Sequence, residues 1–113
     1  MATKVNLVVD QGATFTTTIS LTNDDGSIFD LQGYTGKSQL AKHYTSNSKT
    51  DIDVSLANTA PATGVVTLSM SSNTTSDLLA GRYVYDVELT DEDGVISRIV
   101  EGIITVTPQV TST

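Results

Sequence analysis

The chain has 113 residues, 38% of them hydrophobic, which suits one domain with a single core. Thirteen acidic against six basic residues give a formal net charge of -7, so we expect no binding to nucleic acid, whose phosphates attract positive surfaces. The lack of cysteine excludes disulfides and thiolate chemistry, and no apolar stretch is long enough for a secretory signal or a membrane span, so we expect a soluble domain without a membrane partner.

The first half of the chain alternates apolar and polar residues, the period-two pattern of half-buried strands. This alternation predicts strands at residues 5–9 and 14–21, the second rich in β-branched threonine. Residues 34–44 predict a third, more polar strand. The polarity of this third strand indicates either a sheet edge or a face open to solvent, and at an edge Lys37 and Lys42 would discourage pairing with other chains.

The middle of the chain predicts two more strands and one helical turn. Alternation returns at residues 51–56, and again at residues 65–70 after a loop of small and turn-forming residues. Residues 71–81 then combine hydroxyl side chains suited to helix capping with two leucines and a terminal Gly81. We expect one short helical turn here rather than a strand.

The last two predicted strands close the domain. Residues 82–89 predict a central strand, and residues 95–107 predict a final strand that is too long to be flat. The alternation of the final strand is ambiguous at Glu101–Gly102, where we expect a bulge. A proline then ends the strand, so we expect a domain of residues 1–108 and a tail of residues 109–113. The residues of the sixth strand expected to face the core are Tyr83, Tyr85, Val87 and Leu89.

Seven short strands, one isolated helical turn and no long helix indicate an all-β fold. The length and the strand count predict an immunoglobulin-like β-sandwich of about seven antiparallel strands. The Cys, Trp, Cys signature of true immunoglobulin domains is absent, so only the architecture is expected. A closed barrel with the same strand count is the structural alternative, because alternation does not count sheets.

Two eight-residue segments are near twins, LTNDDGSI at residues 21–28 and LTDEDGVI at residues 89–96. Each stands where an alternating stretch ends, and Asp-Gly is among the strongest short signals for a hairpin turn. The alternative is calcium binding, because carboxylates cluster in both segments, but neither has the twelve-residue ligand spacing of an EF-hand. We therefore expect two structural turns and neither a metal nor a cofactor.

An enzyme would have to be built around a single histidine, His43. The sequence has no nucleophile elbow, no metal-ligand spacing and no phosphate-binding loop. His43 lies in the polar segment LAKHYTSNSK, which favours an exposed position at a strand end. We expect no catalytic residues and no enzymatic activity.

The clearest candidate contact surface is a small basic and aromatic cluster in an otherwise acidic chain. Its five residues are Lys37, Lys42, His43, Tyr44 and Lys49. Such a cluster suits an acidic partner, or a sugar stacked on the tyrosine ring. The alternative interpretation is a solvated edge strand and loop, in which the lysines only prevent edge-to-edge pairing.

Four segments carry a resemblance to a known family: VNLVVDQGATFTTTISLTNDDG at residues 5–26, FDLQGYTGKSQL at residues 29–40, TGVVTLSM at residues 63–70 and TTSDLLAGRYVYDVELTDEDGVISRIVEGIITVTP at residues 74–108. Their succession resembles small virion proteins of tailed bacteriophages, in particular the immunoglobulin-like N-terminal domain of phage baseplate upper proteins. The resemblance implies a non-enzymatic structural or assembly module of a baseplate, tail, neck or capsid. It also implies location in the virion, after synthesis in the cytoplasm of a bacterial host, with other virion proteins or further copies of the chain as partners.

A second functional hypothesis is a carbohydrate-binding β-sandwich on a host-recognition fibre, in which Tyr44 and neighbouring polar residues contact the sugar. Sugar sites usually need exposed aromatic rings. The chain has no Trp, four Tyr and two Phe, and Tyr83 and Tyr85 are expected to face inward, so few rings remain. We therefore rank this hypothesis below the structural module.

Overall fold

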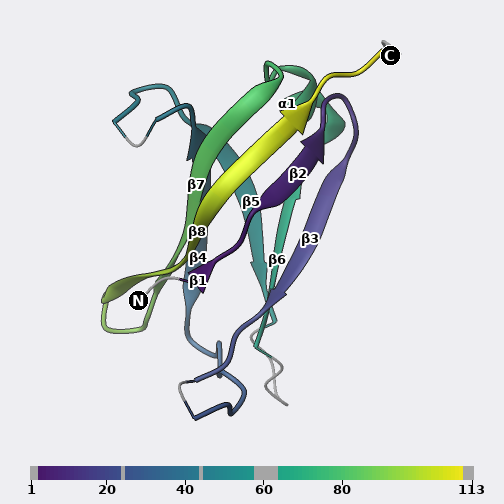
Figure 1. Cartoon of the computed structure of the whole chain (residues 1–113). Coiled ribbons are helices and arrows are strands. Elements are labelled where there is room, and N and C mark those ends of the chain that lie inside the picture. Colours follow the sequence, from purple (N-terminus) through teal and green to yellow (C-terminus); the bar gives the residue numbers. More distant parts are fainter. Residues whose placement is uncertain (1–2, 24, 44, 58–63, 111–113) are drawn as a thin grey trace.

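The computed structural model describes residues 3–23, 25–43, 45–57 and 64–110, and this part of the chain is almost entirely β-structure (Figure 1). The strands are β1 (Thr3–Lys4), β2 (Leu7–Asp10), β3 (Phe15–Ser20), β4 (Thr35–Ala41), β5 (Thr50–Leu56), β6 (Val65–Met70), β7 (Gly81–Thr90) and β8 (Ile96–Thr107). One short helix, α1 (Ser72–Ser76), lies between β6 and β7. The chain is an immunoglobulin-like β-sandwich, as the alternation predicts.

The strands follow the order β1-β8-β7-β4-β5-β6-β3, and β2 also pairs with β8. The sheet curls into two layers because β5 changes partner along its length: its first residues, up to Ile52, face β4, and those from Asp53 onward face β6. Among the strands of the described chain, β3 pairs with β6 alone, so the sheet does not close into the alternative barrel. Apolar residues of both layers point into the space between them.

The first predicted strand is split, and its direction differs from the expected antiparallel arrangement. β1 and β2 both run parallel to β8, with Lys4 facing Glu101 and Leu7 facing Ile104 in one continuous register. Between them, the side-chain Oδ1 of Asn6 accepts a hydrogen bond from a backbone N–H of β8. Alternation predicts that these residues form a strand but carries no information on its partner or direction, so the expectation of antiparallel strands throughout was wrong here.

Of the two interpretations of residues 34–44, the sheet edge was wrong, whereas a strand with one face open to solvent is confirmed. β4 lies between β7 and β5 and pairs with both. The strand reads as polar because its outer face carries Lys37 and Gln39, and because one inward residue, Ser38, is polar but satisfied. The buried Ser38 hydroxyl donates to the backbone carbonyl of Asp86 over 2.6 Å. The lysines therefore do not guard a sheet edge.

The bulge in the last strand lies two residues before its predicted position. Val87 faces Val100 and Glu88 faces Arg98, which leaves Ile99 as the extra residue on β8. Gly102 instead marks a close approach of two strands, because a Cβ atom at this position would overlap the backbone carbonyl oxygen of Val5. The small residue that suggested a bulge is thus required by crowding between β8 and Val5, which lies between β1 and β2.

The predicted short helical turn is confirmed, but Gly81 does not end it. The Ser71 side chain caps α1 by accepting a hydrogen bond from the N–H of Thr74 over 3.3 Å. Thr75 is fully buried, and its hydroxyl donates to the carbonyl of Ala13 over 2.8 Å, which ties the helix to the end of the β2–β3 turn. The helix ends at Ser76, so Gly81 does not terminate it and is instead the first residue of β7.

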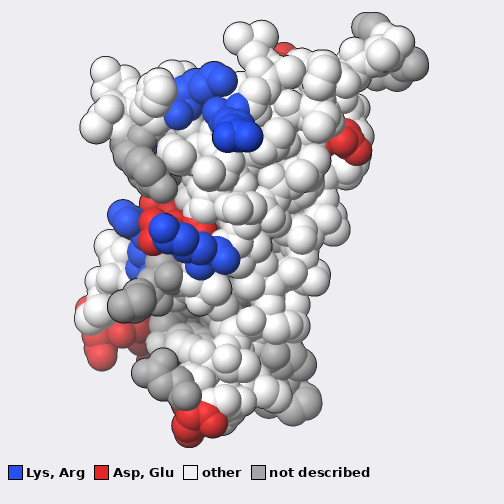
Figure 2. All heavy atoms as spheres, in the orientation of Figure 1, with Lys and Arg blue, Asp and Glu red and all other residues white. Residues whose placement is uncertain are grey.

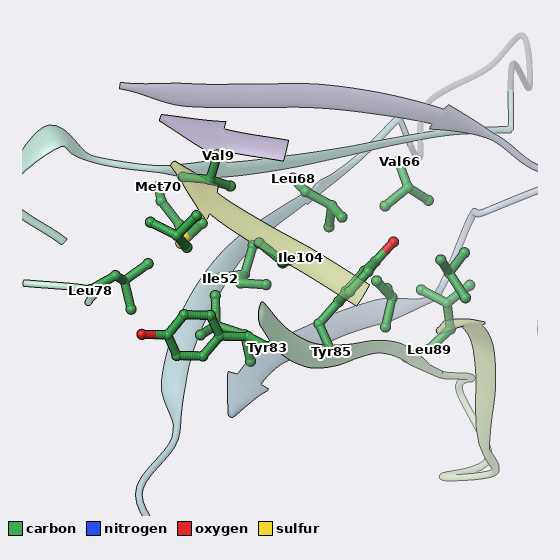
Figure 3. Close-up of a cluster of buried hydrophobic side chains, with 14 of the residues drawn as sticks. Val9, Ile52, Val66, Leu68, Met70, Leu78, Tyr83, Tyr85, Leu89 and Ile104 are labelled. Atoms are coloured by element: carbon green, nitrogen blue, oxygen red, sulfur yellow. The ribbon is translucent and has the colours of Figure 1, made fainter. Parts of the chain in front are cut away.

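The core lies between the two layers and is formed by apolar side chains from six strands and two connecting segments (Figure 3). β7 is central, between β8 and β4, and its four inward residues are buried as the sequence predicts. Leu31 belongs to the connection between β3 and β4, yet it is fully buried. The buried core residues are Val9, Leu31, Leu40, Ile52, Val66, Leu68, Met70, Leu78, Tyr83, Tyr85, Val87, Leu89, Val100, Ile104 and Val106.

Tyr85 joins the core to the first strand through its hydroxyl group. The ring is 2% exposed, and the hydroxyl donates to the carbonyl of Val5 over 2.6 Å. Burial disfavours the phenolate and raises the pKa of Tyr85 from 10.0 to about 12. The folded protein therefore keeps a proton that the unfolded chain loses at lower pH, so this group stabilises the fold below pH 10 and ceases to do so as the pH rises towards 12.

We expect the free energy of unfolding to fall by about 2 kcal/mol between pH 10 and pH 12 on account of Tyr85. Urea unfolding followed by circular dichroism at pH steps in this range measures the effect. The Tyr85→Phe variant is expected to start about 1 kcal/mol less stable, because the carbonyl of Val5 loses its donor. The variant should then show a flatter pH dependence, and equal slopes in the two proteins would contradict the role given to the buried phenol.

No helix in the described part of the chain has the length and apolar character needed to cross a membrane, and α1 itself has only five residues.

Candidate functional site

Charge is unevenly distributed over the two layers. β3, β6 and α1 contain no charged residue, whereas β4, β5, β7 and β8 carry lysine, arginine and carboxylates on their outer faces. Figure 2 shows basic and acidic side chains gathered against one another on one side of the molecule, while the side over β2 and β3 is nearly free of them. The outer face of the β4–β7–β8 layer is therefore the chemically distinctive surface.

This face holds an open hollow of about 310 Å³, which we call the mixed-charge groove. β4 and β7 form its floor, the start of the β4–β5 connection supplies one wall, and β8 supplies the other. Because β4 and β7 are each paired on both sides, their outward side chains are held by a rigid sheet. The polar residues that line the groove are Gln39, His43, Lys49, Asp86, Glu88 and Arg98.

Arg98 is the best-positioned cation of the groove. Its Nε atom lies 3.4 Å from Asp86 Oδ2, and its Nη1 atom lies 4.0 Å from Glu101 Oε2. The side chain of Arg98 is 49% exposed, so these two ion pairs together contribute at most about 1 kcal/mol to stability. Their main effect is to fix the direction of the guanidinium group, which leaves donors available to a partner.

The structure brings together two of the five residues singled out from the sequence. His43 and Lys49 stand at either end of the β4–β5 connection, and both line the mixed-charge groove. Lys37 is exposed on β4, opposite Glu88 in the strand register. Lys42 is directed elsewhere, with its Nζ atom 4.7 Å from the ring centroid of Tyr83. Tyr44 lies outside the described residues.

Lys42 has a structural role rather than a role in the groove. Its ammonium group lies over the face of the Tyr83 ring and donates to the carbonyl of Arg82 over 3.5 Å. The hydroxyl of Tyr83 in turn donates to the carbonyl of Leu79 over 2.7 Å. Lys42 thereby helps to fasten the segment before β7 to the end of β4.

Sequence reasoning missed the groove residues contributed by β7 and β8. Asp86, Glu88 and Arg98 come from strands remote in sequence from the basic cluster. The only available signal was that alternation places Asp86 and Glu88 on the outward side of their strand. Without knowledge that β7 lies beside β4, that signal does not connect them to His43 or Lys49.

The twin segments form the same turn twice. In the first, the Asn23 N–H donates to the Ser27 carbonyl and the Gly26 N–H donates to the Asn23 carbonyl. In the second, the Asp91 N–H donates to the Val95 carbonyl and the Gly94 N–H donates to the Asp91 carbonyl. Both glycines have positive φ, 87° and 86°, which a residue with a side chain rarely adopts. The prediction of one structural solution used twice is confirmed.

The carboxylates of these turns are used by the turns themselves. Asp25 Oδ1 accepts bonds from the N–H and the hydroxyl of Ser27, and these bonds lower the pKa of Asp25. Asp91 Oδ1 accepts bonds from the N–H groups of Asp93 and Val95, at 2.9 Å each. Among the residues that the structure describes, which do not include Asp24, no group of three or more carboxylate, histidine or cysteine side chains is arranged to hold a metal ion.

The lining of the mixed-charge groove combines hydrogen-bond donors and acceptors of both charges. Its described residues include one imidazole and two carboxylates but no serine, threonine or cysteine that could act as a nucleophile. The backbone N–H of His43 donates to the Ser46 hydroxyl over 3.0 Å, and this hydrogen bond shapes the turn. The arrangement offers fixed donors beside fixed acceptors, which is a pattern for docking a polar segment.

The aromatic residues that the structure describes offer no exposed ring for a sugar. Tyr83 and Tyr85 are buried, and Phe15, Phe29 and Tyr34 are partly buried. The Phe29 and Tyr34 rings contact each other, with centroids 5.4 Å apart. The carbohydrate hypothesis therefore still depends on Tyr44, and it stays a prediction.

No protein-family model and no curated protein matches the sequence. Among solved structures, a mutant of the SrpA adhesin from Streptococcus sanguinis is similar at 13% identity and a TM-score of 0.54, with 91% of this chain and 55% of that chain covered. An internalin-like protein of Listeria monocytogenes gives 17% identity and a TM-score of 0.45, with 94% of this chain and 28% of that chain covered.

A third solved structure is AggA, the major subunit of aggregative adherence fimbriae type I from Escherichia coli. It gives 12% identity and a TM-score of 0.38, with 90% of this chain and 89% of that chain covered. This chain spans about half the length of the adhesin, 55%, and at 13% identity that likeness shows the fold alone.

Proposed function

We propose that this chain is a non-enzymatic structural module that docks to other proteins of a larger particle through the mixed-charge groove, and that the particle is a bacteriophage virion. The observation that carries the docking surface is the pairing of Arg98 with Asp86, on strands that are held on both sides, beside Lys49 and His43 at the two ends of the β4–β5 connection. Such a rigid array of donors and acceptors binds a partner with little loss of side-chain freedom.

The chemistry of the groove defines the partner. Arg98 and Lys49 favour a carboxylate or carbonyl, while Asp86 and Glu88 favour an N–H or ammonium group. The rest of the chain is acidic, so a partner that carries both signs of charge is steered to this groove and aligned in it. A polar segment of a neighbouring particle protein meets these requirements.

The virion part of the proposal is supported by the succession of sequence motifs that resembles small phage proteins. In this fold the motif residues hold the structure: Leu31 is fully buried, Tyr85 anchors the first strand, and Gly94 forms the β7–β8 turn. A domain that keeps these residues suits an accessory part of a baseplate, tail, neck or capsid.

Incorporation into particles tests this function. We expect antibodies against the purified chain to detect it in particles purified from a lysed host culture. We expect the double substitution Lys49→Glu with Arg98→Glu to reduce incorporation at least about tenfold, because the groove then carries only carboxylates and repels the partner's acidic groups. Circular dichroism checks that the variant is folded.

Arg82→Glu is the matched control, because Arg82 is an exposed cation of β7 that does not line the groove. Its incorporation should equal that of the unmodified chain. Absence of the chain from purified particles would refute the virion part, and equal incorporation of the groove variant would refute the docking surface.

A further inference from the structure

The outer edge of β3 is an unpaired sheet edge. β3 is the last strand in the sheet and pairs with β6 on one side only. The Leu21 N–H donates to the Gly64 carbonyl over 2.7 Å. In an antiparallel pair every second residue directs its backbone groups towards the partner strand, so this bond identifies which residues of β3 do so. The backbone groups of Thr17 and Ile19 consequently point towards β6, and those of Thr16, Thr18 and Ser20 point away from it. Every second residue from Thr16 to Ser20 thus presents its N–H and carbonyl groups outward.

This edge lacks the devices that usually prevent strand pairing. The sequence FTTTIS contains no charge and no proline, its register with β6 has no bulge, and its residues favour extended structure. The opposite edge of the sheet is different. There β1 and β2 are short, they carry Lys4 and Asp10, and between them the side chain of Asn6 takes a ladder position. β3 is therefore the unprotected edge.

The charge distribution selects the occupant of this edge. Residues 13–22 and 64–76, which include β3, α1 and β6, contain no charged residue in a chain of net charge -7. Two copies that meet through a charged surface bring carboxylates together, whereas the β3 strands themselves carry none. The uncharged strand β3 is also the strand whose outer edge is open, so a second copy of this chain fits the edge.

We propose that two copies of this chain associate by antiparallel pairing of their β3 strands about a two-fold axis through Thr18. In this register Thr18 faces Thr18 of the second copy and Thr16 faces Ser20, so all outward-pointing backbone groups of both strands are paired. The hydroxyl side chains meet on one face of the joined sheet. On the other face Thr17 of one copy meets Ile19 of the second copy, and these side chains shield apolar side chains that are only partly buried in one copy alone.

A hollow beside β3 receives the edge of the second copy. It measures about 340 Å³ and lies between β2 and β3, where Leu7 and Phe15 are only partly buried. Asp10 is the one charged residue in its lining. This interface is separate from the mixed-charge groove, so it neither requires nor excludes the proposed docking function.

Light scattering behind size exclusion tests the proposal on the purified chain alone. We expect a dimer, with twice the chain mass of 11.9 kDa. Thr18→Pro and Thr18→Lys are expected to give monomers, because the first removes an outward N–H and the second places a charge on the axis. Thr67→Lys is the matched control: Thr67 lies opposite Thr18 on β6, whose backbone is already paired on both sides, so this variant should remain dimeric.

Cysteine cross-linking supplies an independent readout, since the chain has no cysteine of its own. In the proposed register the Cα atoms of the two copies at position 18 lie about 5.5 Å apart, within reach of a disulfide. Thr18→Cys should therefore form a covalent dimer on mild oxidation, and Thr67→Cys should not. A monomer at every concentration up to the solubility limit, or a dimer that both Thr18→Pro and Thr18→Lys leave intact, would overturn the proposal.

Discussion

Replacing Gly102 by alanine is expected to lower the free energy of unfolding by about 3 kcal/mol, near the upper end for a single added methyl group. A Cβ atom at this position would overlap the carbonyl oxygen of Val5 and lie 2.8 Å from its carbonyl carbon. Those atoms belong to backbone, which cannot rotate away as a flexible side chain can. The same carbonyl accepts the Tyr85 hydroxyl, so displacing it also breaks a buried hydrogen bond.

Urea unfolding measures this loss, and amide hydrogen exchange locates it. The N–H of Val5 donates to the carbonyl of Glu101 over 2.9 Å, so its exchange should accelerate in the variant before the rest of the sheet opens. Gly94→Ala is the control, because Gly94 has positive φ but no atom within 4 Å of an added Cβ. It should lose only about 1 kcal/mol from backbone strain. A Gly102 variant as stable as the unmodified chain would show that β1 does not pack as described.

Replacing Leu31 by alanine is also expected to lower the free energy of unfolding by about 3 kcal/mol. Leu31 is fully buried although it lies in a connection between strands, so its truncation leaves a cavity at the end of the core that the rigid sheets cannot fill. Thermal unfolding followed by circular dichroism should show a clearly lower midpoint. The β-strand signal below the transition should be unchanged, because no strand contains this residue.

Leu79→Ala serves as the matched control for Leu31. Leu79 is also a leucine in a connection, but it is 74% exposed. Its truncation should change stability by no more than about 0.5 kcal/mol. If the two variants lost equal stability, Leu31 would not be the anchor that its burial indicates.

The strands themselves were largely predictable because their side chains obey a period of two. In β7, every inward residue predicted from alternation is buried, and in β6 the inward set of Val66, Leu68 and Met70 is buried as well. The twin turns were predictable for the same local reason, since Asp-Gly specifies its backbone conformation with little help from the rest of the chain. Interactions between residues close in the sequence determined these elements.

Strand neighbours and directions were not predictable in this way. A strand with outward lysines looks the same from its sequence whether it lies at an edge or between two partners, so the sequence did not decide between these two positions for β4. Gly102 was interpreted as a bulge because glycine weakens a strand, whereas here it makes room for another strand. In each case the deciding contact comes from residues far away in the sequence.

The same distinction between local and long-range contacts explains which residues of the candidate site were predictable. His43 and Lys49 were found because basic residues cluster within a short segment of an acidic chain. Asp86 and Arg98 were not, because only the β4–β7–β8 register carries them to the same surface. Conversely, Lys42 belonged to the sequence cluster and yet lies over the Tyr83 ring, since direction along a strand, not proximity in sequence, decides what a side chain meets.

The parallel pairing of β1 and β2 with β8 has a consequence for how the molecule folds. Thr3 meets Val100 and Asp10 meets Thr107, so the two ends of the described chain must find each other before the layer is complete. Contacts of such long sequence separation slow folding, because the entropy of closing the loop is lost before the contact forms. During synthesis on a ribosome, the first strand thus waits unpaired until the last strand has emerged. A pause or truncation before β8 would leave β7 as an exposed template for other nascent chains.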